Sequence, residues 1–478
     1  MPDANTPADY GSDAPENPVF FVGVGGSGMM PLAMILAARG ATVAGSDRSL
    51  DQARLPAKFE YLRDLGVALF PQDGSGITSS DQIVVASAAI EPSVPDMVAA
   101  ERFGCARRTR AEMLADLFND ATMPIAVGGT SGKSTVTGMI GWILRAADRD
   151  PTVMNGAVMK NFATPNAPFA SALVGGGDAF VSEVDESDGS IALFAPRVAV
   201  LNNVSLDHKS LEELNQLFGD FIAKAELAVI NMDNPDAAAL ARTLPARKVV
   251  GFGIDSDATF TARDIEQRPF GVSFTLVVKD QDPLPVELQV PGRHNVSNAL
   301  AAIAAAHCAG LALDEAVLAI AGFTGLRRRF EFVGETRGVA VLDDFGHNPD
   351  KIAATLTTLN AFSGRLLILF QPHGYGPLKV MRRELVEAFA SNLKPGDVLI
   401  LPDPAYYGGT VAREVTSADI VADLVAKGCD ARHIADRAEA AAAIASLAES
   451  GDRAIVMGAR DDTLSQVAGD ILAAIAER

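Results

Sequence analysis

The chain has 478 residues, of which 48% are hydrophobic, and it carries a formal net charge of −20 at pH 7. A chain of this length is expected to form about three domains, each able to bury its own core. The acidic excess excludes proteins whose main partner is nucleic acid or an anionic membrane, because those partners need a basic surface. A small anionic ligand is still allowed, since local loops and arginines can bind it.

Cysteine usage and hydropathy indicate a cytoplasmic protein. Cys105, Cys308 and Cys429 are far apart, with no pair at metal-ligand spacing, so we expect packing thiols in a reducing compartment. No basic segment precedes an apolar run at the N-terminus, and no apolar run reaches the roughly 18 residues of a membrane span. The alanine-rich stretch 299–306, interrupted by His307, predicts a buried helix.

The first part of the chain predicts a nucleotide-binding fold. Residues 1–17 are polar and proline-rich, and they are expected to be a disordered tail. An apolar strand at 18–22 leads into the turn Gly-Val-Gly-Gly-Ser-Gly at 23–28, then a helix over 32–38 and a strand ending at Asp47. This arrangement matches the fingerprint of dinucleotide-binding domains, which has an acidic residue about 20 positions after the turn. The candidate diphosphate contacts in the turn are Gly25, Gly26, Ser27 and Gly28.

Two ligands fit this first domain, which we place at 18–120. In an NAD-dependent dehydrogenase, Asp47 would contact the ribose; alternatively, the same turn would bind another diphosphate, such as that of a UDP-sugar. A separate triphosphate loop at 128–135 counts against the dehydrogenase, which does not need one. The cofactor is not decided by the fingerprint alone.

Further candidate contacts follow two more predicted strands, at 66–70 and 82–86. Ser87 comes directly after the second of them. The basic cluster 107–110 precedes a helix over 111–117. Such a cluster is usually a solvated face, but in so acidic a chain its last residue, Arg110, is also a candidate diphosphate contact.

The second predicted domain, 121–325, begins with a phosphate-binding loop. An apolar strand at 123–127 breaks into a glycine-rich turn, and a helix follows over 136–144. Glycines let backbone N–H groups face an anion, the lysine supplies a positive charge, and the serine hydroxyl can hold Mg²⁺. The expected ligand is a nucleoside triphosphate, bound by Gly129, Thr130, Ser131, Gly132, Lys133, Ser134 and Thr135. The standard loop has glycine where this chain has Val127, so a turn that only joins strand to helix stays open here.

Two further strands of this domain end in metal-binding residue types. The strand at 179–184 carries Glu183 near its end, and the strand at 198–201 leads to His208. Because ligands gather at the carboxyl ends of the strands in such sheets, these side chains are expected to converge with Lys133 and Ser134. A hydroxyl, a carboxylate and an imidazole beside a triphosphate indicate Mg²⁺, with Ser134, Glu183 and His208 as its ligands. The adjacent Asp185, Glu186 and Asp188 are expected to shape the field or to face solvent.

The remaining chain predicts more α/β structure. Expected elements are helices within 212–245 around a strand at 227–230, strands at 271–278 and 286–290, and a long helix over 296–309 preceded by Pro-Gly-Arg-His-Asn. His294 in that segment could cap the helix or contact nucleotide. Arg327, Arg328 and Arg329 form a candidate hinge with a phosphate clamp. The third domain, 326–478, has expected strands at 339–342, 365–370, 397–401 and 454–457 and a helix over 351–359.

These motifs, in this order, resemble the Mur ligases of peptidoglycan synthesis over nearly the whole chain. They are Gly23 to Gly28, Gly-Thr-Ser-Gly-Lys-Ser at 129–134, Ser-Glu-Val-Asp-Glu-Ser-Asp at 182–188, Asn203 with Asp207 and His208, Pro-Gly-Arg-His-Asn at 291–295, Arg328-Arg-Phe330, Asp344 with His347 and Pro349, and Gln-Pro-His at 371–373. The family's own loop is built around Gly-Thr-x-Gly-Lys-Thr/Ser, so Val127 is no longer a departure. The greatest similarity is to the branch that adds L-alanine or a ready-made tripeptide to UDP-N-acetylmuramate.

The resemblance implies an α/β protein of three domains: an N-terminal Rossmann-like domain for UDP, a central ATPase domain with a mixed sheet, and a C-terminal Rossmann-like domain for the amine. It implies ATP and Mg²⁺ as cofactors, with Lys133, Glu183, His208 and His347 as catalytic residues. Asn295, Arg329 and Asp344 match nucleotide-contacting positions; Gly25 to Gly28, Asp47, Ser87 and Arg110 belong to the UDP-sugar site; His347, His373 and Lys379 belong to the acceptor site.

The implied reaction is amide bond formation. ATP would convert the muramoyl carboxylate into an acyl phosphate, an amine would attack it, and phosphate would leave. Closure about the segment 325–330 would exclude water from this step.

Departures from the family pattern concern the acceptor. L-Alanine-adding enzymes have arginines where this chain has Gly374 and Pro377, and a second histidine where it has Asn348. Lys379, Arg382 or Arg383 could bind the acceptor carboxylate instead, or the acceptor could be a peptide.

Several alternatives stay open at this point. They are a non-catalytic regulatory homologue that binds a nucleotide sugar, and a Mur-like ligase for a substrate outside peptidoglycan, such as a polyglutamate or cyanophycin ligase. The expected partners are a UDP-N-acetylmuramate-type substrate and an amino acid or peptide, with no nucleic acid and no membrane. The protein is expected to be a monomer or a homodimer.

Overall fold

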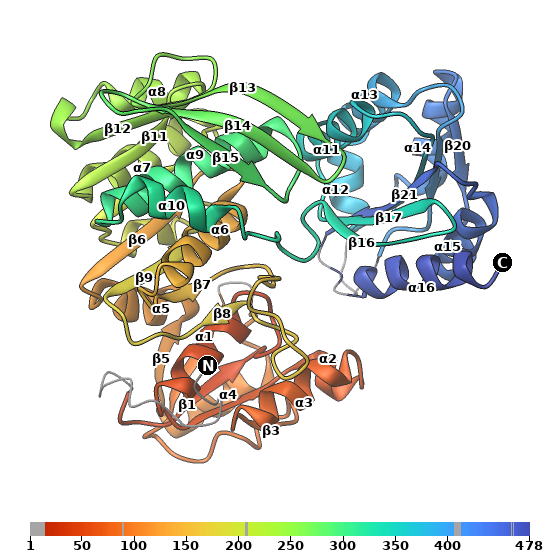
Figure 1. The fold of residues 1–478 in the computed structure, drawn as a ribbon. Helices are drawn as coiled ribbons and strands as arrows, with labels where there is room; N and C mark the ends of the chain where they lie inside the picture. Colours follow the sequence, from red (N-terminus) through yellow and green to blue (C-terminus); the bar gives the residue numbers. More distant parts are fainter. Residues whose placement is uncertain (1–14, 88–89, 206–208, 406–412, 460, 462) are drawn as a thin grey trace. The chain divides into compact units, whose positions relative to one another are not determined.

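A computed structural model describes residues 15–87, 90–205, 209–405, 413–459, 461 and 463–478 (Figure 1). The chain divides into two compact units. The first contains the chain up to Gln267 together with Val272–Gln289 and Asn295–Gly325, and the second contains Leu326–Arg478 together with Arg268–Gly271 and Val290–His294. In the described part of the chain, no helix is both long enough and apolar enough to cross a membrane.

The first sheet of unit 1 has five parallel strands in the order β3-β2-β1-β4-β5. Strand β1 is buried on both faces: Phe20 and Val22 pack with helix α4, whereas Val19 and Phe21 pack with α1. The elements are β1 (Val19–Val22), α1 (Met29–Ala38), β2 (Val43–Ser46), α2 (Arg48–Asp51), α3 (Pro56–Asp64), β3 (Ala68–Phe70), β4 (Ile83–Ala86), α4 (Pro95–Phe103), β5 (Ala106–Thr109) and α5 (Arg110–Asn119).

The second sheet of unit 1 has ten strands in the order β15-β14-β13-β12-β11-β10-β6-β9-β7-β8. Its centre is parallel, and antiparallel pairs β7–β8 and β14–β15 lie towards its two edges. The elements are β6 (Met123–Gly128), α6 (Lys133–Ala146), β7 (Thr152–Met154), β8 (Ala172–Leu173), β9 (Ala179–Glu183), η1 (Ser190–Leu193), β10 (Val198–Leu201), α7 (Leu211–Lys224), β11 (Leu227–Asn231), α8 (Pro235–Ala241), η2 (Ala246–Lys248), β12 (Val249–Gly253), β13 (Phe260–Arg268), β14 (Gly271–Val278), β15 (Leu284–Leu288), α9 (Arg293–Cys308) and α10 (Leu313–Ile320).

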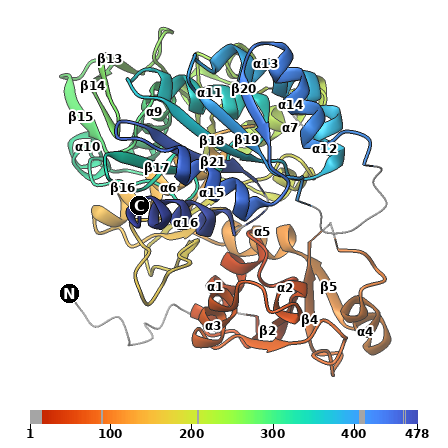
Figure 2. The ribbon, with the colours of Figure 1, turned by 90° about the vertical axis from the view of Figure 1, so that its right-hand side faces the viewer.

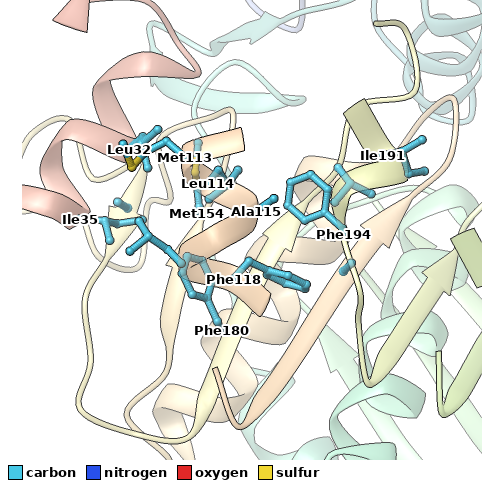
Figure 3. Packing of buried hydrophobic residues seen from close by; sticks show 14 of the residues in the cluster. Leu32, Ile35, Met113, Leu114, Ala115, Phe118, Met154, Phe180, Ile191 and Phe194 are labelled. Carbon is cyan, nitrogen blue, oxygen red and sulfur yellow. The ribbon is translucent and has the colours of Figure 1, made fainter. Parts of the chain in front are cut away.

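The two sheets of unit 1 share one apolar core (Figure 3). Helix α5, which ends the first domain, places Phe118 against Phe180 of β9 and against Phe194, with ring centroids 5.7 and 5.3 Å apart in edge-to-face geometry. Leu32 and Ile35 of α1 belong to the same cluster. Edge-to-face rings add to the stabilisation from apolar burial, so the first two domains form one packed body.

Unit 2 has a six-stranded sheet in the order β16-β17-β21-β18-β19-β20, parallel except for the edge strand β16. Helices α11, α13 and α14 pack on one face and α15 and α16 on the other (Figure 2). The elements are β16 (Glu331–Thr336), β17 (Val339–Asp344), α11 (Pro349–Asn360), β18 (Leu366–Gln371), α12 (Tyr375–Val380), α13 (Arg382–Asn392), β19 (Val398–Leu401), α14 (Ser417–Ala426), β20 (Asp430–His433), α15 (Arg437–Leu447), β21 (Arg453–Gly458) and α16 (Leu464–Ala476).

The predicted fold class is confirmed, and the predicted strands that carry site residues are present. Two local differences concern the basic cluster and the arginine segment. Residues 106–109, for which no strand was expected, form edge strand β5, so Arg110 opens helix α5 directly. Arg328 and Phe330 have φ values of 58° and 47°, a left-handed conformation that side chains with a Cβ adopt at a cost.

Candidate active site

The predicted site residues of unit 1 gather at the carboxyl ends of parallel strands. In the central sheet, Glu183 pairs in register with Val127, and Leu201 pairs with Gly128. Strands β10, β6 and β9 are neighbours in the middle of the sheet. Their carboxyl ends therefore bring together the segment after β10, the phosphate loop and Glu183. This placement agrees with the rule that ligands of such sheets bind where strands end.

The phosphate loop needs its glycines for two reasons. Gly129 and Gly132 have φ values of 134° and 80°, which glycine adopts without strain. A Cβ on Gly132 would lie 2.3 Å from the Asn202 side-chain nitrogen, and one on Gly129 would lie 3.0 Å from the Asn203 backbone nitrogen. Helix α6 begins at Lys133, so the loop presents a helix N-terminus, which favours a bound phosphate.

Side-chain amides from two segments, the one after β10 and helix α9, support the loop. The Asn203 Oδ1 atom accepts hydrogen bonds from Thr130 Oγ1 at 3.0 Å and Ser131 N at 2.9 Å. The Asn202 Nδ2 atom donates to Ser131 O at 3.0 Å and to Asn298 Oδ1 at 3.2 Å. Asn298 in turn donates to Asn295 Oδ1 at 3.1 Å. The predicted nucleotide contact Asn295 is thus joined to the phosphate loop through buried amides.

The lysine of the loop is held by two acceptors. Lys133 Nζ donates to the Gly129 carbonyl at 2.6 Å and to Glu186 Oε2 at 2.7 Å. Glu186 is buried, with 5% of its surface exposed, so it does not face solvent, and of the two expected roles only the electrostatic one is compatible with its contact to Lys133. The contact was missed because sequence spacing cannot show which member of an acidic run turns inward.

The residues expected to hold Mg²⁺ are brought together in part. Ser134 Oγ donates to Glu183 Oε2 at 2.7 Å, and a Cβ on Gly156 would lie 2.1 Å from Glu183 Oε1. A hydroxyl and a carboxylate are hard oxygen donors of the kind that Mg²⁺ prefers, so this pair fits that ion. His208, the third expected ligand, lies outside the described residues.

The first-domain residues also meet at one strand edge. Val22 pairs with Ser46 and with Ala86, and Ala86 pairs with Thr109, so the glycine turn, Ser87 and Arg110 follow neighbouring strands. The structure gives Asp47 an internal role: its carboxylate accepts from Gly25 N at 2.9 Å and from Ser49 N at 2.7 Å, where it caps α2. The Asp47 carboxylate, which was expected to contact the ligand, thus hydrogen-bonds the backbone of the glycine turn.

Arg110 packs on the end of the glycine turn. A Cβ on Gly28 would lie 3.0 Å from Arg110 Cδ and 3.3 Å from its Nε, so the absence of a side chain at Gly28 lets this arginine pack closely on the turn. Arg110 is the first residue of α5, where the helix dipole disfavours a cation. A neighbouring anion would offset that cost. Asp185 is one such group. Burial acts to raise the pKa of its carboxyl, but the hydrogen bonds from Ser187 and the charges of Lys133 and Arg110 outweigh burial and lower that pKa.

In unit 2, Asp344 organises the segment predicted to contact ATP. Its Oδ2 accepts from Phe330 N at 2.7 Å, and its Oδ1 accepts from Gly346 N at 2.7 Å and Thr355 Oγ1 at 3.1 Å. Arg328 and Arg329 both lie over the Phe345 ring, but Arg328 is also tied to backbone carbonyls. Arg328 is buried and donates to the Gly458 and Asp461 carbonyls, and the Arg329 guanidinium lies over the Phe345 ring, 4.2 Å from its centroid.

The two histidines predicted at the acceptor site are neighbours. The rings of His347 and His373 are 5.2 Å apart and nearly perpendicular. His347 Nδ1 lies 2.8 Å from the Phe345 carbonyl, which can only accept, so the proton is on Nδ1 and Nε2 offers a lone pair. Burial, with the charges of Lys351, His373 and Arg329, lowers the pKa of His347 to about 3, so the ring is neutral near pH 7.

The cations expected to replace the missing arginines already have carboxylate partners. Lys379 pairs with Glu414, and Arg382 pairs with Asp423 through two hydrogen bonds of 2.7 and 3.1 Å. Arg383 is 91% exposed and pairs with Glu384. Asn348, at the position of the family's second histidine, uses its side chain to cap α11 by accepting a hydrogen bond from Lys351 N.

Comparison with known proteins supports this arrangement over most of the chain. Residues 18–122, 127–306 and 328–460 match family models for the Mur ligase family catalytic domain, the Mur ligase middle domain and the Mur ligase glutamate ligase domain. A UDP-N-acetylmuramate–L-alanine ligase of Caulobacter sp. (strain K31) is 34% identical over 464 residues, covering 93% of this chain and 94% of the relative. The chain belongs to the Mur ligase family.

Other relatives agree with this assignment. A UDP-N-acetylmuramate–L-alanine ligase of Streptomyces coelicolor is 36% identical, covering 93% of this Mur ligase and 95% of the relative. A UDP-N-acetylmuramate-alanine ligase from Thermotoga maritima has a similar fold, with a TM-score of 0.79 at 24% identity over 96% of this chain and 99% of its own. A murein peptide ligase from Psychrobacter arcticus gives a TM-score of 0.71 at 23% identity over 97% and 99%.

Membership of the family decides two questions that the sequence left open. This Mur ligase is an ATP-dependent ligase, and the glycine turn of its first domain does not make it a dehydrogenase. The residues that sequence reasoning missed are Asn202, Asn298 and Glu186. Spacing gave no signal for them, because each acts by contacting a segment far away in the chain.

Proposed function

We propose that this Mur ligase uses ATP and Mg²⁺ to join the carboxylate of UDP-N-acetylmuramate to the amine of L-alanine or of a peptide. The observation that carries the proposal is the Ser134–Glu183 pair beside Lys133, on the same packed unit as a second glycine turn against which Arg110 of α5 packs. We take the donor and the L-alanine acceptor from the related UDP-N-acetylmuramate–L-alanine ligases. Three free cysteines suit a reducing compartment such as the cytoplasm.

Each part of unit 1 has a task in this reaction. The loop N–H groups and Lys133 bind and orient the phosphates, and Ser134 with Glu183 would hold the metal ion. When bound, Mg²⁺ offsets the negative charge on the transferring phosphoryl group. Arg110 and the turn ending at Gly28 would hold the UDP-sugar, so that its carboxylate reaches the phosphate and becomes an acyl phosphate.

The acceptor chemistry would fall to unit 2. His347 Nε2 offers a lone pair that can accept a hydrogen bond from an entering amine, and its low pKa keeps it from carrying a charge that would repel an ammonium group. The amine nitrogen bonds to the acyl carbon, the bond from that carbon to the phosphate oxygen breaks, and the departing phosphate takes up the proton that the amine releases. Closure of the domains would exclude water, which would otherwise hydrolyse the acyl phosphate.

A peptide is the second candidate acceptor. It is favoured by the carboxylate pairing of Lys379 and Arg382 and by the absence of arginine at 374 and 377, because a free amino acid presents its carboxylate close to the reacting amine. In a peptide that carboxylate lies farther away, so the residues around His347 and His373 would not need to bind it.

The test is phosphate release with ATP, Mg²⁺, UDP-N-acetylmuramate and a panel of amino acids and short peptides. We expect turnover with at least one acceptor and loss of essentially all turnover in Lys133→Ala. Silence with every acceptor would contradict the proposal. Turnover only with a donor other than UDP-N-acetylmuramate would point to a Mur-like ligase outside peptidoglycan synthesis.

A further inference from the structure

Glu186 is the side chain that most closely controls the charge of the phosphate loop. Its carboxylate lies 2.7 Å from Lys133 Nζ, and among the described residues Lys133 is its only hydrogen-bonding or ion-pairing side chain. The Glu186 side chain is 7% exposed and the Lys133 side chain 19% exposed. The pair is therefore largely withdrawn from water, unlike the exposed ion pairs of unit 2.

The backbone directs Glu186 inward. Strand β9 ends at Glu183, and the chain then makes a tight turn in which Asp185 Oδ1 accepts from Ser187 N at 2.9 Å and the Glu186 carbonyl accepts from Gly189 N at 3.2 Å. Gly189 completes the turn with a φ of 79°, which favours glycine. Ser187 and Asp188 are exposed, and of the two remaining acidic residues of the turn, Asp185 and Glu186, it is Glu186 that hydrogen-bonds Lys133.

The ion pair is expected to persist when nucleotide binds. Removing the partner of a buried carboxylate leaves an uncompensated charge, which costs several kcal/mol. A lysine ammonium has three donor hydrogens, and the contacts to Gly129 and Glu186 use two of them. The third is enough for a phosphate oxygen, so the lysine does not have to leave Glu186 in order to bind triphosphate.

We propose that Glu186 is a positioning residue that fixes the Lys133 ammonium against the Gly129 carbonyl and offsets its charge, so that the enzyme exchanges part of its affinity for ATP for a precisely placed lysine during phosphoryl transfer. A free lysine would bind the polyphosphate more strongly but in several positions. A fixed lysine binds it less strongly, and its remaining hydrogen points in one direction.

Two substitutions separate the charge from the geometry. Glu186→Gln keeps an oxygen that can accept from Lys133 and removes the negative charge, whereas Glu186→Ala removes both. Asp188→Asn is the matched control, because it makes the same change of charge two residues away on an exposed side chain. Thermal unfolding of all three variants shows whether each is folded.

In Glu186→Gln we expect the Kd for Mg-ATP, measured by calorimetry, to fall by about tenfold, because a negative charge near the phosphates has been removed. We expect kcat to fall by about tenfold in Glu186→Gln and by more in Glu186→Ala, as the lysine loses its restraint. Asp188→Asn should leave both quantities within about twofold of the wild type.

The turnover part of this experiment rests on the proposed ligase activity, whereas the calorimetric part does not. If no acceptor supports turnover in the wild type, the proposed function fails and the Kd comparison still tests Glu186. An unchanged Kd in folded Glu186→Gln, or an equal fall in Asp188→Asn, would overturn the inference. An increase in Kd with unchanged kcat would also overturn it, because it would show a purely supportive role.

Discussion

Asn203 and Ser131 are joined by three hydrogen bonds: Asn203 Oδ1 accepts from Ser131 N at 2.9 Å, and Asn203 Nδ2 donates to Ser131 Oγ at 2.8 Å and to Ser131 O at 3.2 Å. A single planar amide thus ties the middle of the phosphate loop to the segment after β10. Because loop flexibility would have to be lost on binding triphosphate, this contact prepares the loop for its ligand.

Substitution of Asn203 should therefore affect ATP more than the other substrates. Asn203→Ala leaves the Ser131 N–H and the Thr130 hydroxyl without their acceptor, and we expect the KM for ATP to rise by about tenfold. The KM for UDP-N-acetylmuramate should stay within about twofold, because the first-domain turn is untouched. Initial rates at varied concentrations of each substrate check this; an equal rise in both KM values would contradict it.

Ser134 should determine the requirement for metal. Ser134→Ala removes the hydroxyl that bonds Glu183, so one of two adjacent oxygen donors is lost. We expect the Mg²⁺ concentration for half-maximal rate to rise by about tenfold, with partial recovery of kcat at high Mg²⁺. Thr135→Ser is the control, since it retains a hydroxyl one residue further along. Equal Mg²⁺ dependence in wild type and Ser134→Ala would argue against this metal site.

Asp343 should make unit 2 less stable as pH rises. The residue is fully buried, 3.4 Å from Arg328 Nε, and burial raises the pKa of its carboxyl to about 6. Because this value lies above that of an unfolded aspartate, the stabilisation from the protonated form is complete below about pH 4 and is lost as pH rises through about 6. The loss corresponds to about 3 kcal/mol.

Denaturant unfolding of Asp343→Asn and wild type across pH 4 to 8 measures this effect. Other carboxylates titrate in both proteins, so the difference between their free energies of unfolding isolates Asp343. We expect that difference to change by about 3 kcal/mol between the two ends of the range, with the wild type relatively less stable at high pH. Parallel curves would show that Asp343 does not titrate in this window.

His347 should remain neutral throughout the working range. Its pKa is lowered to about 3, mainly by burial, and its Nδ1 proton is bonded to the Phe345 carbonyl. The associated stability is present above the unfolded histidine pKa of about 6.5 and is lost as pH falls towards 3. In an NMR titration, the ring signal that disappears in His347→Gln should not shift between pH 5 and 8. A shift with a midpoint near 6.5 would contradict the buried, neutral ring.

The ion pair between Lys379 and Glu414 allows a test of the acceptor site, because substituting its two members should change the acceptor KM in opposite directions. If Lys379 binds the acceptor carboxylate, Lys379→Ala should raise the acceptor KM by several-fold, whereas Glu414→Ala should lower it by freeing the ammonium. Exposed ion pairs are worth about 0–1 kcal/mol, so neither change should alter stability much. If neither substitution changes the acceptor KM, the acceptor carboxylate is not bound by Lys379.

Much of the fold, including the glycine-rich loop between β6 and α6, could be predicted because the signals are local. A glycine turn between an apolar strand and a helix commonly binds phosphate. The strands at 179–183 and 198–201 were recognisable as short apolar runs. The resemblance to the family added the order of the domains. What local patterns could not give was the use of side chains over long distances.

Glu186 and Asp47 illustrate that limit. Both are acidic residues after a strand, but one turns inward onto Lys133 and the other bonds the backbone of Gly25. Arg328 looked like part of a phosphate clamp and instead packs inside unit 2, because the left-handed conformation at this position points it towards the carbonyls after β21. Such outcomes depend on backbone direction, which spacing alone does not encode.

The apolar core that continues from α5 to β9 has a consequence for exchanging parts between relatives. A first domain transplanted from another Mur ligase would bring its own partner for Phe180 and Phe194, and a mismatch would leave a cavity between aromatic rings. Under the proposed function, the donor-binding domain is therefore exchanged together with this packing surface. Swaps that keep the residues facing Phe118 should fold, whereas swaps made at the sequence boundary alone should be insoluble.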